Sequence, residues 1–215
     1  MDHGQFAGLR IDYGDEPLRR AQLPADPAVL FHEWLGAAAS AGVSEPNAMA
    51  LATCDATGQP HCRIVLLKQV DARGFVFFTN KHSDKGRQLA ERPRAAATFW
   101  WSAPRNRQVR AEGAIEHVPD AEADAYFASR PRLAQLCSAA SPQSRPVRDR
   151  AELEQQVERL VAAVGDGPIT RPAHWGGYVL RPEVVEFWQG RSGRLHDRFR
   201  FARAAGSWTV ERLAP

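Results

Sequence analysis

Three side chains near the C-terminus have the types and spacing that suit an anionic, planar ligand. Residues 186–199 read EFWQGRSGRLHDRF, in which Arg194, His196 and Arg198 follow one another at intervals of two. In an extended segment, this spacing places all three side chains on one face. Two guanidinium groups and an imidazole repel one another, so they would gain from facing an anion, with Trp188 as a stacking wall. The alternative is an ordinary solvated strand edge.

Further segments add cations and amides in a defined order along the chain. Residues 63–68 read RIVLLK, 83–88 read SDKGRQ, 107–108 read RQ, 126–132 read YFASRPR and 143–145 read QSR. Lys68 and Lys85 lie inside these segments, and Lys81 is the one other lysine among 28 basic residues. A compact ammonium differs from a planar guanidinium in reach and geometry. The placement indicates a site that needs point charges, although chance is the alternative for so few residues.

The elements that must position these segments are strands with helices inserted between them. Asp26 is expected to cap a helix to about Gly42, Ser83 a short helix that ends before Pro93, and Asp120 a helix to about Arg130. Strands are expected over 47–54, 61–70, 74–80, 94–101 and 107–118, with three or four more over 175–213. A second short helix is expected after Pro131, and an amphipathic helix over 149–164 with these residues inward: Leu153, Val157, Leu160 and Val161.

This pattern predicts an α+β fold, an antiparallel β-barrel with peripheral helices. No GxGxxG motif follows a strand, which disfavours a dinucleotide-binding parallel sheet. Residues 1–24 are expected to form a flexible arm, and residues 25–215 a single domain.

Composition excludes several classes of function. The chain has 215 residues, of which 44% are hydrophobic and 25% charged, as in an ordinary soluble protein. No apolar run suits a membrane span or a signal peptide, and a net charge of +3 without a basic block gives no sign of nucleic-acid binding. Three cysteines without a CxxC pair favour a reducing, cytoplasmic location and argue against a metal site.

Together, the six segments resemble the pyridoxine/pyridoxamine 5′-phosphate oxidase family, whose members use FMN. LPADP at 23–27 and WTVERLAP at 208–215 extend the resemblance from about Arg10 to Pro215. The resemblance implies a split β-barrel and a homodimer with FMN in the groove between its subunits. It also implies oxidation of pyridoxamine or pyridoxine 5′-phosphate to pyridoxal 5′-phosphate, with O2 as the electron acceptor and H2O2 as a product. The preference between amine and alcohol stays open, as does the existence of a second pyridoxal phosphate site.

The resemblance assigns a role to individual residues of this chain. It implies contacts with FMN for Arg63, Ile64, Val65, Leu66, Leu67, Lys68, Phe78, Thr79, Lys85, Gln108, Gln143, Ser144, Trp188 and Arg198. It implies contacts with the substrate for Arg10, Tyr13, Lys68, Tyr126, Arg130, Arg194 and His196. Arg194 and His196 are the catalytic candidates: Arg194 would hold the substrate, and His196 would bond its ring hydroxyl or assist proton removal.

Two departures from the family pattern leave other functions open. Asp84 replaces an arginine expected beside the FMN phosphate, and Ala134 replaces a serine expected at the substrate phosphate. An acid in a first helical turn is locally stabilising, so we expect Asp84 to pair with Arg87 and not to face the phosphate. The alternatives are a flavin oxidase of the phenazine-biosynthesis type, which needs no complete phosphate pocket, and a flavin-binding protein without turnover.

Overall fold

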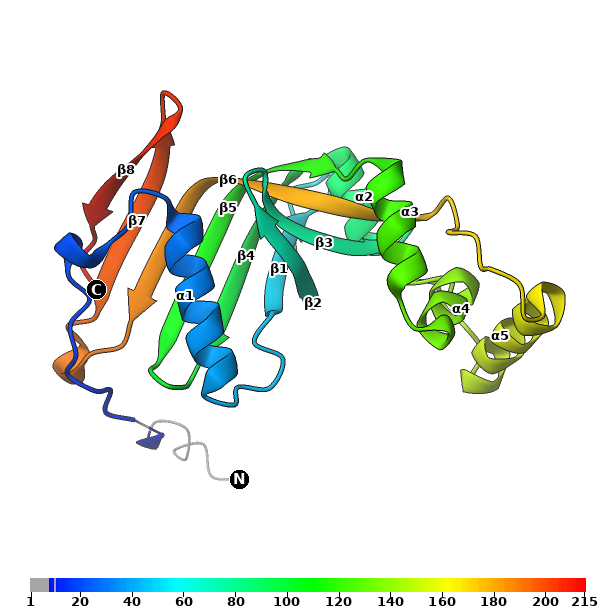
Figure 1. Ribbon diagram of the computed structural model, residues 1–215, viewed down its shortest axis with the longest axis horizontal. Coiled ribbons are helices and arrows are strands. Elements are labelled where there is room, and N and C mark those ends of the chain that lie inside the picture. The colour runs from blue at the N-terminus through cyan, green and yellow to red at the C-terminus, as the bar shows by residue number, and fades with distance from the viewer. Residues whose placement is uncertain (1–7, 10) are drawn as a thin grey trace. The chain divides into compact units, whose positions relative to one another are not determined.

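The computed structural model describes residues 8, 9 and 11–215 (Figure 1). Its helices are α1 (Pro27–Ser40), α2 (Asp84–Glu91), α3 (Asp120–Ser129), α4 (Arg132–Ala140) and α5 (Arg150–Val164), with short 3-10 turns η2 (Arg20–Gln22) and η3 (Ser192–Arg194). Its strands are β1 (Ala48–Cys54), β2 (Pro60–Asp71), β3 (Gly74–Asn80), β4 (Arg94–Trp101), β5 (Arg107–His117), β6 (Trp175–Gln189), β7 (Asp197–Ala204) and β8 (Ser207–Arg212). No helix in this described part of the chain is long and apolar enough to cross a membrane.

Two of the three predicted helix caps are confirmed. Asp26 accepts a hydrogen bond from the backbone N–H of Ala28 at 2.9 Å, and Ser83 Oγ accepts one from the N–H of Gly86 at 3.3 Å. The prediction that Asp120 caps α3 is wrong, because the residue before it, Pro119, occupies that position without a side-chain cap. Asp120 instead lies in the first turn and pairs with Arg171 at 2.8 Å.

The strands hydrogen-bond in the order β3-β2-β1-β4-β5-β6-β7-β8, and β3 also pairs with β6. That additional pairing closes β1 to β6 into the expected antiparallel barrel. In its register, Phe77 lies opposite Tyr178 and Thr79 opposite Gly176. β7 and β8 continue the sheet beyond β6, with Phe187 opposite Phe199.

The chain forms two compact units, and residues 50–96 with 113–181 make up the one that contains α2 to α5. Its core includes Val76, Val118 and Val179, with Phe78 packed against them. A Cβ at Gly177 would lie 2.6 Å from the Phe78 ring and 2.7 Å from Val118, so this strand position requires glycine. The glycine thus lets Phe78 approach the sheet closely.

Residues 1–49, 97–112 and 182–215 make up the other unit, in which α1 lies across the strands (Figure 1). Phe31 of α1 is fully buried and meets Phe99 edge-on, with 4.9 Å between ring centroids. Trp34, one turn later, meets Phe187 at 5.2 Å. The i, i+3 spacing of these two aromatics is therefore what binds α1 to the sheet.

The inward face predicted for α5 is confirmed only in part, because Leu153, Val157 and Leu160 are half-buried and Val161 is exposed. None of its residues is buried, and Val161 is 44% exposed. Leu153 and Val157 instead line a pocket, because α5 packs mainly against α4 and not on the barrel core.

Candidate functional site

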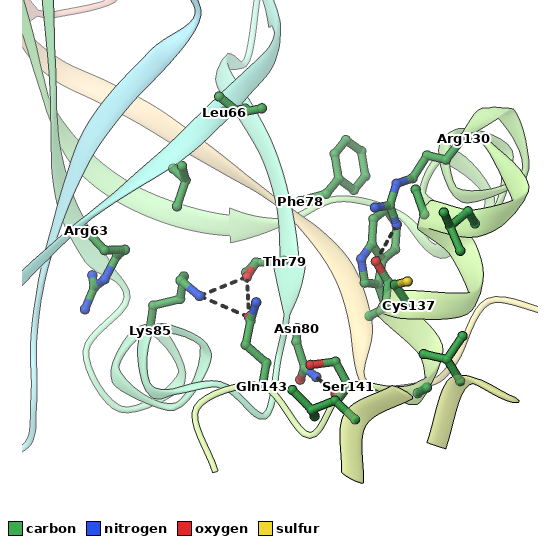
Figure 2. Close-up of a pocket in the computed structure, with 18 of the residues that line it drawn as sticks. Arg63, Leu66, Phe78, Thr79, Asn80, Lys85, Arg130, Cys137, Ser141 and Gln143 are labelled. Carbon is green, nitrogen blue, oxygen red and sulfur yellow. Dashed lines mark hydrogen bonds between the residues drawn. The ribbon is translucent and has the colours of Figure 1, made fainter. Parts of the chain in front are cut away.

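A pocket of about 1100 Å³ lies in the unit that contains α2 to α5 (Figure 2). It gathers predicted residues from five separate segments of the chain: Arg63, Ile64, Val65, Leu66, Lys68, Phe78, Thr79, Lys85, Tyr126, Arg130 and Gln143. β2 and β3 supply the first seven, and α2 supplies Lys85. Tyr126 lies in α3, Arg130 directly follows that helix, and Gln143 lies in the loop after α4. Figure 2 shows Arg63 and Lys85 at one end of the pocket and Arg130 at the other.

The ammonium group of Lys85 is held by three neutral oxygens. Its Nζ donates to Gln143 Oε1 at 3.1 Å, Thr79 Oγ1 at 3.2 Å and Ser83 Oγ at 3.3 Å. The side chain is nearly buried, and burial followed by the charge of Arg63 lowers its pKa. A buried ammonium held only by neutral dipoles retains its attraction for an anion.

Arg63 is oriented in the same way by partners that carry no charge. Its guanidinium donates to Thr53 Oγ1 at 2.6 Å, to Gln88 Oε1 at 3.0 Å and to the Leu51 carbonyl at 3.1 Å. Thr53 itself donates to Gln88 at 2.6 Å, so the two side chains form one buried support. Burial lowers the pKa of Arg63, as it does for Lys85.

At the other end of the pocket, Arg130 lies against an aromatic wall. Its guanidinium carbon lies 5.1 Å from the centre of the Trp175 ring, and its NH1 group donates to Ser138 Oγ at 2.9 Å. Phe78 stacks on both Tyr126, at 4.2 Å, and Trp175, at 5.3 Å, and these two rings lie 6.1 Å from each other. Burial lowers the pKa of Arg130.

The charges of the pocket favour anions. Within the residues described, Arg63, Lys85 and Arg130 form no ion pair with a carboxylate, and neither does Lys68, which is exposed at the pocket. The lining acids Glu154 and Glu158 both lie on α5, and Glu154 pairs with Arg150 at 2.6 Å. Cations desolvated without counter-ions provide charge-assisted donors for phosphate groups.

Some predicted residues do not line this pocket. The side chain of Leu67 is buried in the core, and Ser144 is exposed with φ 68°. Asp84 lies outside the pocket and pairs with Arg87 on the same helix, as expected from the sequence. Arg10 lies outside the described residues.

The other compact unit holds a second cluster of predicted residues. The His196 ring lies 4.7 Å from Trp188 and 5.6 Å from Tyr13, between ring centroids, and Tyr13 meets Trp188 edge-on at 5.7 Å. Gln108 is partly exposed on β5 of this unit. Segments near both ends of the chain therefore contribute to this aromatic cluster.

The prediction that Arg194, His196 and Arg198 share one face of an extended segment is wrong. Arg194 belongs to the turn η3 with φ 60°, and the strand β7 begins only at Asp197. Gly193, with φ 64°, allows this tight turn. Arg198 does lie in β7, opposite Trp188, where its Nε donates to Glu186 at 2.8 Å and this bond raises its pKa. Arg194 is exposed, and in the described chain it makes no ion pair.

Sequence reasoning assigned no role to several residues that shape the pocket. Thr53 and Gln88 support Arg63, Ser138 accepts from Arg130, and Trp175 extends the aromatic wall. One signal was available for Ser138, because it follows Ala134 by four residues and lies on the same face of α4.

The chain matches two family models in succession. Residues 35–162 match the model described as pyridoxamine 5′-phosphate oxidase, and residues 175–215 match the pyridoxine 5′-phosphate oxidase C-terminal dimerisation region. Proteins named pyridoxine/pyridoxamine 5′-phosphate oxidase are similar over their whole length. The protein from Salinibacter ruber is 51% identical over 98% of this chain and 99% of its own. The protein from Synechocystis is 49% identical over 100% of both chains.

Two solved structures show the same fold. PhzG from Burkholderia lata, in complex with tetrahydrophenazine-1-carboxylic acid, is 32% identical and covers 94% of this chain and 100% of its own, with a TM-score of 0.86. An FMN-binding protein from Nostoc punctiforme, related to pyridoxamine 5′-phosphate oxidase, is 19% identical, with coverages of 90% and 99% and a TM-score of 0.69.

Proposed function

This chain belongs to the pyridoxamine 5′-phosphate oxidase family, and from that premise we propose that it oxidises pyridoxamine or pyridoxine 5′-phosphate to pyridoxal 5′-phosphate with FMN. The observation that carries the proposal is the presence of two groups of cations without counter-ions in one pocket. Arg63 and Lys85 form one group and Arg130 lies at the other end of the pocket (Figure 2). Lys68 also lines the pocket, and we assign it to the group of Arg130 by the family resemblance. The reaction requires two phosphate sites, one for the cofactor and one for the substrate.

The donors of the first group fit the phosphate of FMN. Arg63 and Lys85 supply charge, and Gln143 turns its Oε1 toward Lys85, so its amide N–H group is left to donate to the ligand. Gln108 would bond the flavin ring, with Trp188 as an apolar wall and Arg198 as a cation. Bound FMN would supply the redox chemistry, namely acceptance of a hydride from the substrate carbon and reoxidation by O2 to give H2O2.

The second group suits the substrate. Lys68, Tyr126 and Arg130 would hold its phosphate, and the stacked rings of Phe78 and Tyr126 give this part of the pocket an apolar wall. Arg194 and His196 would lie over the substrate ring and orient it. The work of these residues is to position the substrate and place charge around it.

We also propose a homodimer whose flavin site uses residues of both subunits. The match of residues 175–215 to a dimerisation region supports this arrangement. Val161 of α5, which is 44% exposed, and Trp100, which is 50% exposed, offer apolar surface for a partner. A cytoplasmic location, a flexible arm over residues 1–24 and a single domain over 25–215 stay predictions.

A substrate screen tests the function. The purified protein is loaded with FMN, and H2O2 is measured with pyridoxamine 5′-phosphate, with pyridoxine 5′-phosphate and with the same compounds lacking phosphate. We expect peroxide from a phosphorylated compound and little from its unphosphorylated form.

A reduced tricyclic carboxylate serves as the comparison substrate, because PhzG from Burkholderia lata binds a compound of that class. Turnover of this compound alone would favour the phenazine type, and Ala134 would then mark a reduced need for phosphate contacts. Stable FMN binding without any turnover would indicate a flavin-binding protein.

A further inference from the structure

The turn before β7 brings a backbone donor to the catalytic candidate His196. Between Gly190 and Leu195, the chain folds through η3, and Gly193 and Arg194 both adopt positive φ. The backbone N–H of Arg191 consequently donates to Nδ1 of His196 at 3.1 Å. A backbone N–H can only donate, so Nδ1 must present its lone pair. The neutral ring then carries its proton on Nε2.

The backbone donor is itself held in place. The Arg191 guanidinium contacts Asp197 and Asp15, each at 3.2 Å, and Asp15 also accepts from Ser192 at 2.8 Å. Asp197 is buried and accepts further hydrogen bonds from Arg212 at 2.6 Å and from the Leu18 N–H at 2.9 Å. This network fixes the turn to the segment that follows Tyr13.

The surroundings of the ring disfavour a second proton. Burial, and then the positive charge of Arg194, lower the pKa of His196. The neighbouring titratable groups are Tyr13 and Arg191, and the charge of Arg191 is directed toward its two aspartates. Tyr13 packs so closely on Gly190 that a Cβ there would lie 2.7 Å from its ring. Turning the His196 ring to exchange its two nitrogens would break the hydrogen bond from the Arg191 N–H.

We propose that His196 acts as a hydrogen-bond donor through Nε2–H and not as a proton acceptor, with the Arg191 amide as the positioning group. The inference rests on the proposed function, in which His196 faces the substrate ring. The acceptor for the Nε2–H group of His196 would be a substrate oxygen that bears a lone pair or a negative charge, such as the ring hydroxyl oxygen. A base role would require a free lone pair on Nε2, and the Arg191 bond selects the opposite tautomer.

Nitrogen NMR tests the tautomer without using activity. Protein labelled with ¹⁵N-histidine is examined at neutral pH with and without FMN, and the His196 signals are identified by their loss in His196→Gln. Two-bond proton–nitrogen correlations should show an unprotonated Nδ1 and a protonated Nε2. The opposite tautomer, or a doubly protonated ring, would overturn the inference even if the protein proved to be an oxidase.

Paired variants test the role in catalysis. The amide nitrogen of His196→Gln can donate near the position of Nε2, whereas that of His196→Asn reaches only near Nδ1. We expect kcat/KM of the Gln variant to stay within about tenfold of the native value, because its amide can still donate. The kcat/KM of the Asn variant should fall roughly ten- to a hundredfold further, the effect of a lost hydrogen bond to a charged group.

FMN binding controls for folding in both variants. Equal losses on the order of a hundredfold or more in both would indicate a base and overturn the donor role. If the native protein oxidised none of the B6 compounds, the proposed function would fail, and the NMR result would still decide the tautomer.

Discussion

Nζ of Lys85 lies 3.1 Å from Oε1 of Gln143, although 58 positions separate the two residues along the chain. The contact joins α2 to the loop after α4, and Thr79 of β3 completes it by donating to the same Gln143 oxygen at 3.2 Å. Three separate segments thus meet around one ammonium group whose hydrogen-bond partners are neutral. Such an arrangement is preorganised to bind an anion, since no counter-ion must first be displaced.

Replacing Lys85 tests whether this ammonium binds the FMN phosphate. Lys85→Met keeps the aliphatic length and removes the charge, so FMN affinity should fall by about 1.5–3 kcal/mol, or roughly ten- to a hundredfold. Titration of apo-protein, followed by flavin fluorescence, measures the change. Lys81→Met is the matched control, because Lys81 does not line the pocket. An equal loss in both variants would remove Lys85 from the phosphate site.

Gln88 should affect FMN binding through Arg63. Gln88→Leu removes the oxygen that accepts from both Arg63 and Thr53, so the guanidinium loses its orientation. FMN affinity should fall by about 0.5–1.5 kcal/mol, the net worth of one hydrogen bond.

The double variant Arg63→Met with Gln88→Leu separates orientation from general destabilisation. If Gln88 acts through Arg63, its loss should matter little once Arg63 is absent. Additive losses of FMN affinity would contradict the positioning role.

Arg130→Ala should impair substrate capture more than chemistry. A lost charge-assisted contact with the substrate phosphate costs on the order of 1.5–3 kcal/mol, which should appear mainly in KM where KM reflects binding. Ser138→Ala, which removes a neutral partner of Arg130, should have a smaller effect. A normal KM in folded Arg130→Ala would exclude this residue from the substrate site.

Asp84→Arg should leave FMN binding nearly unchanged. The carboxylate lies outside the pocket and pairs with Arg87, and screening over about 8 Å at physiological salt should limit the change in affinity to about threefold. The substitution puts a cation in the first turn of α2 and should lower stability by about 0.3–1 kcal/mol.

Thermal unfolding and FMN titration at two salt concentrations measure both quantities, with Asp84→Asn as the neutral control. Salt-sensitive tightening of FMN in Asp84→Arg would show instead that position 84 senses the phosphate.

Local chemistry made much of the fold predictable. Asp26 and Ser83 begin helices because their side chains satisfy free backbone N–H groups, and β3 has the bounds expected from its apolar run. The interval of two residues from Arg194 to His196 and Arg198 predicted a shared strand face wrongly, because Gly193 supports a turn and the strand begins only after it. The prediction of burial was also incomplete for α5, because the periodicity of apolar residues identifies an apolar face but not the element that packs against it.

The candidate site was predictable only where the resemblance supplied it. Tyr126 and Arg130, to which the resemblance assigned substrate contacts, both line the pocket. Arg63 is supported by Thr53, 10 positions before it, and by Gln88, 25 positions after it. No local sequence pattern predicts contacts at such separations. Pairing of Arg198 with Glu186 across β6 and β7 likewise follows from strand register.

Anaerobic mixing of the FMN-loaded protein with pyridoxamine 5′-phosphate tests the central claim most directly, because it isolates electron transfer from substrate to flavin. The oxidised flavin absorbance should bleach, pyridoxal 5′-phosphate should form in equal amount, and admission of O2 should restore the absorbance and release H2O2. Flavin absorbance that stays unchanged with both pyridoxamine and pyridoxine 5′-phosphate, in protein that binds FMN stably, would contradict the account.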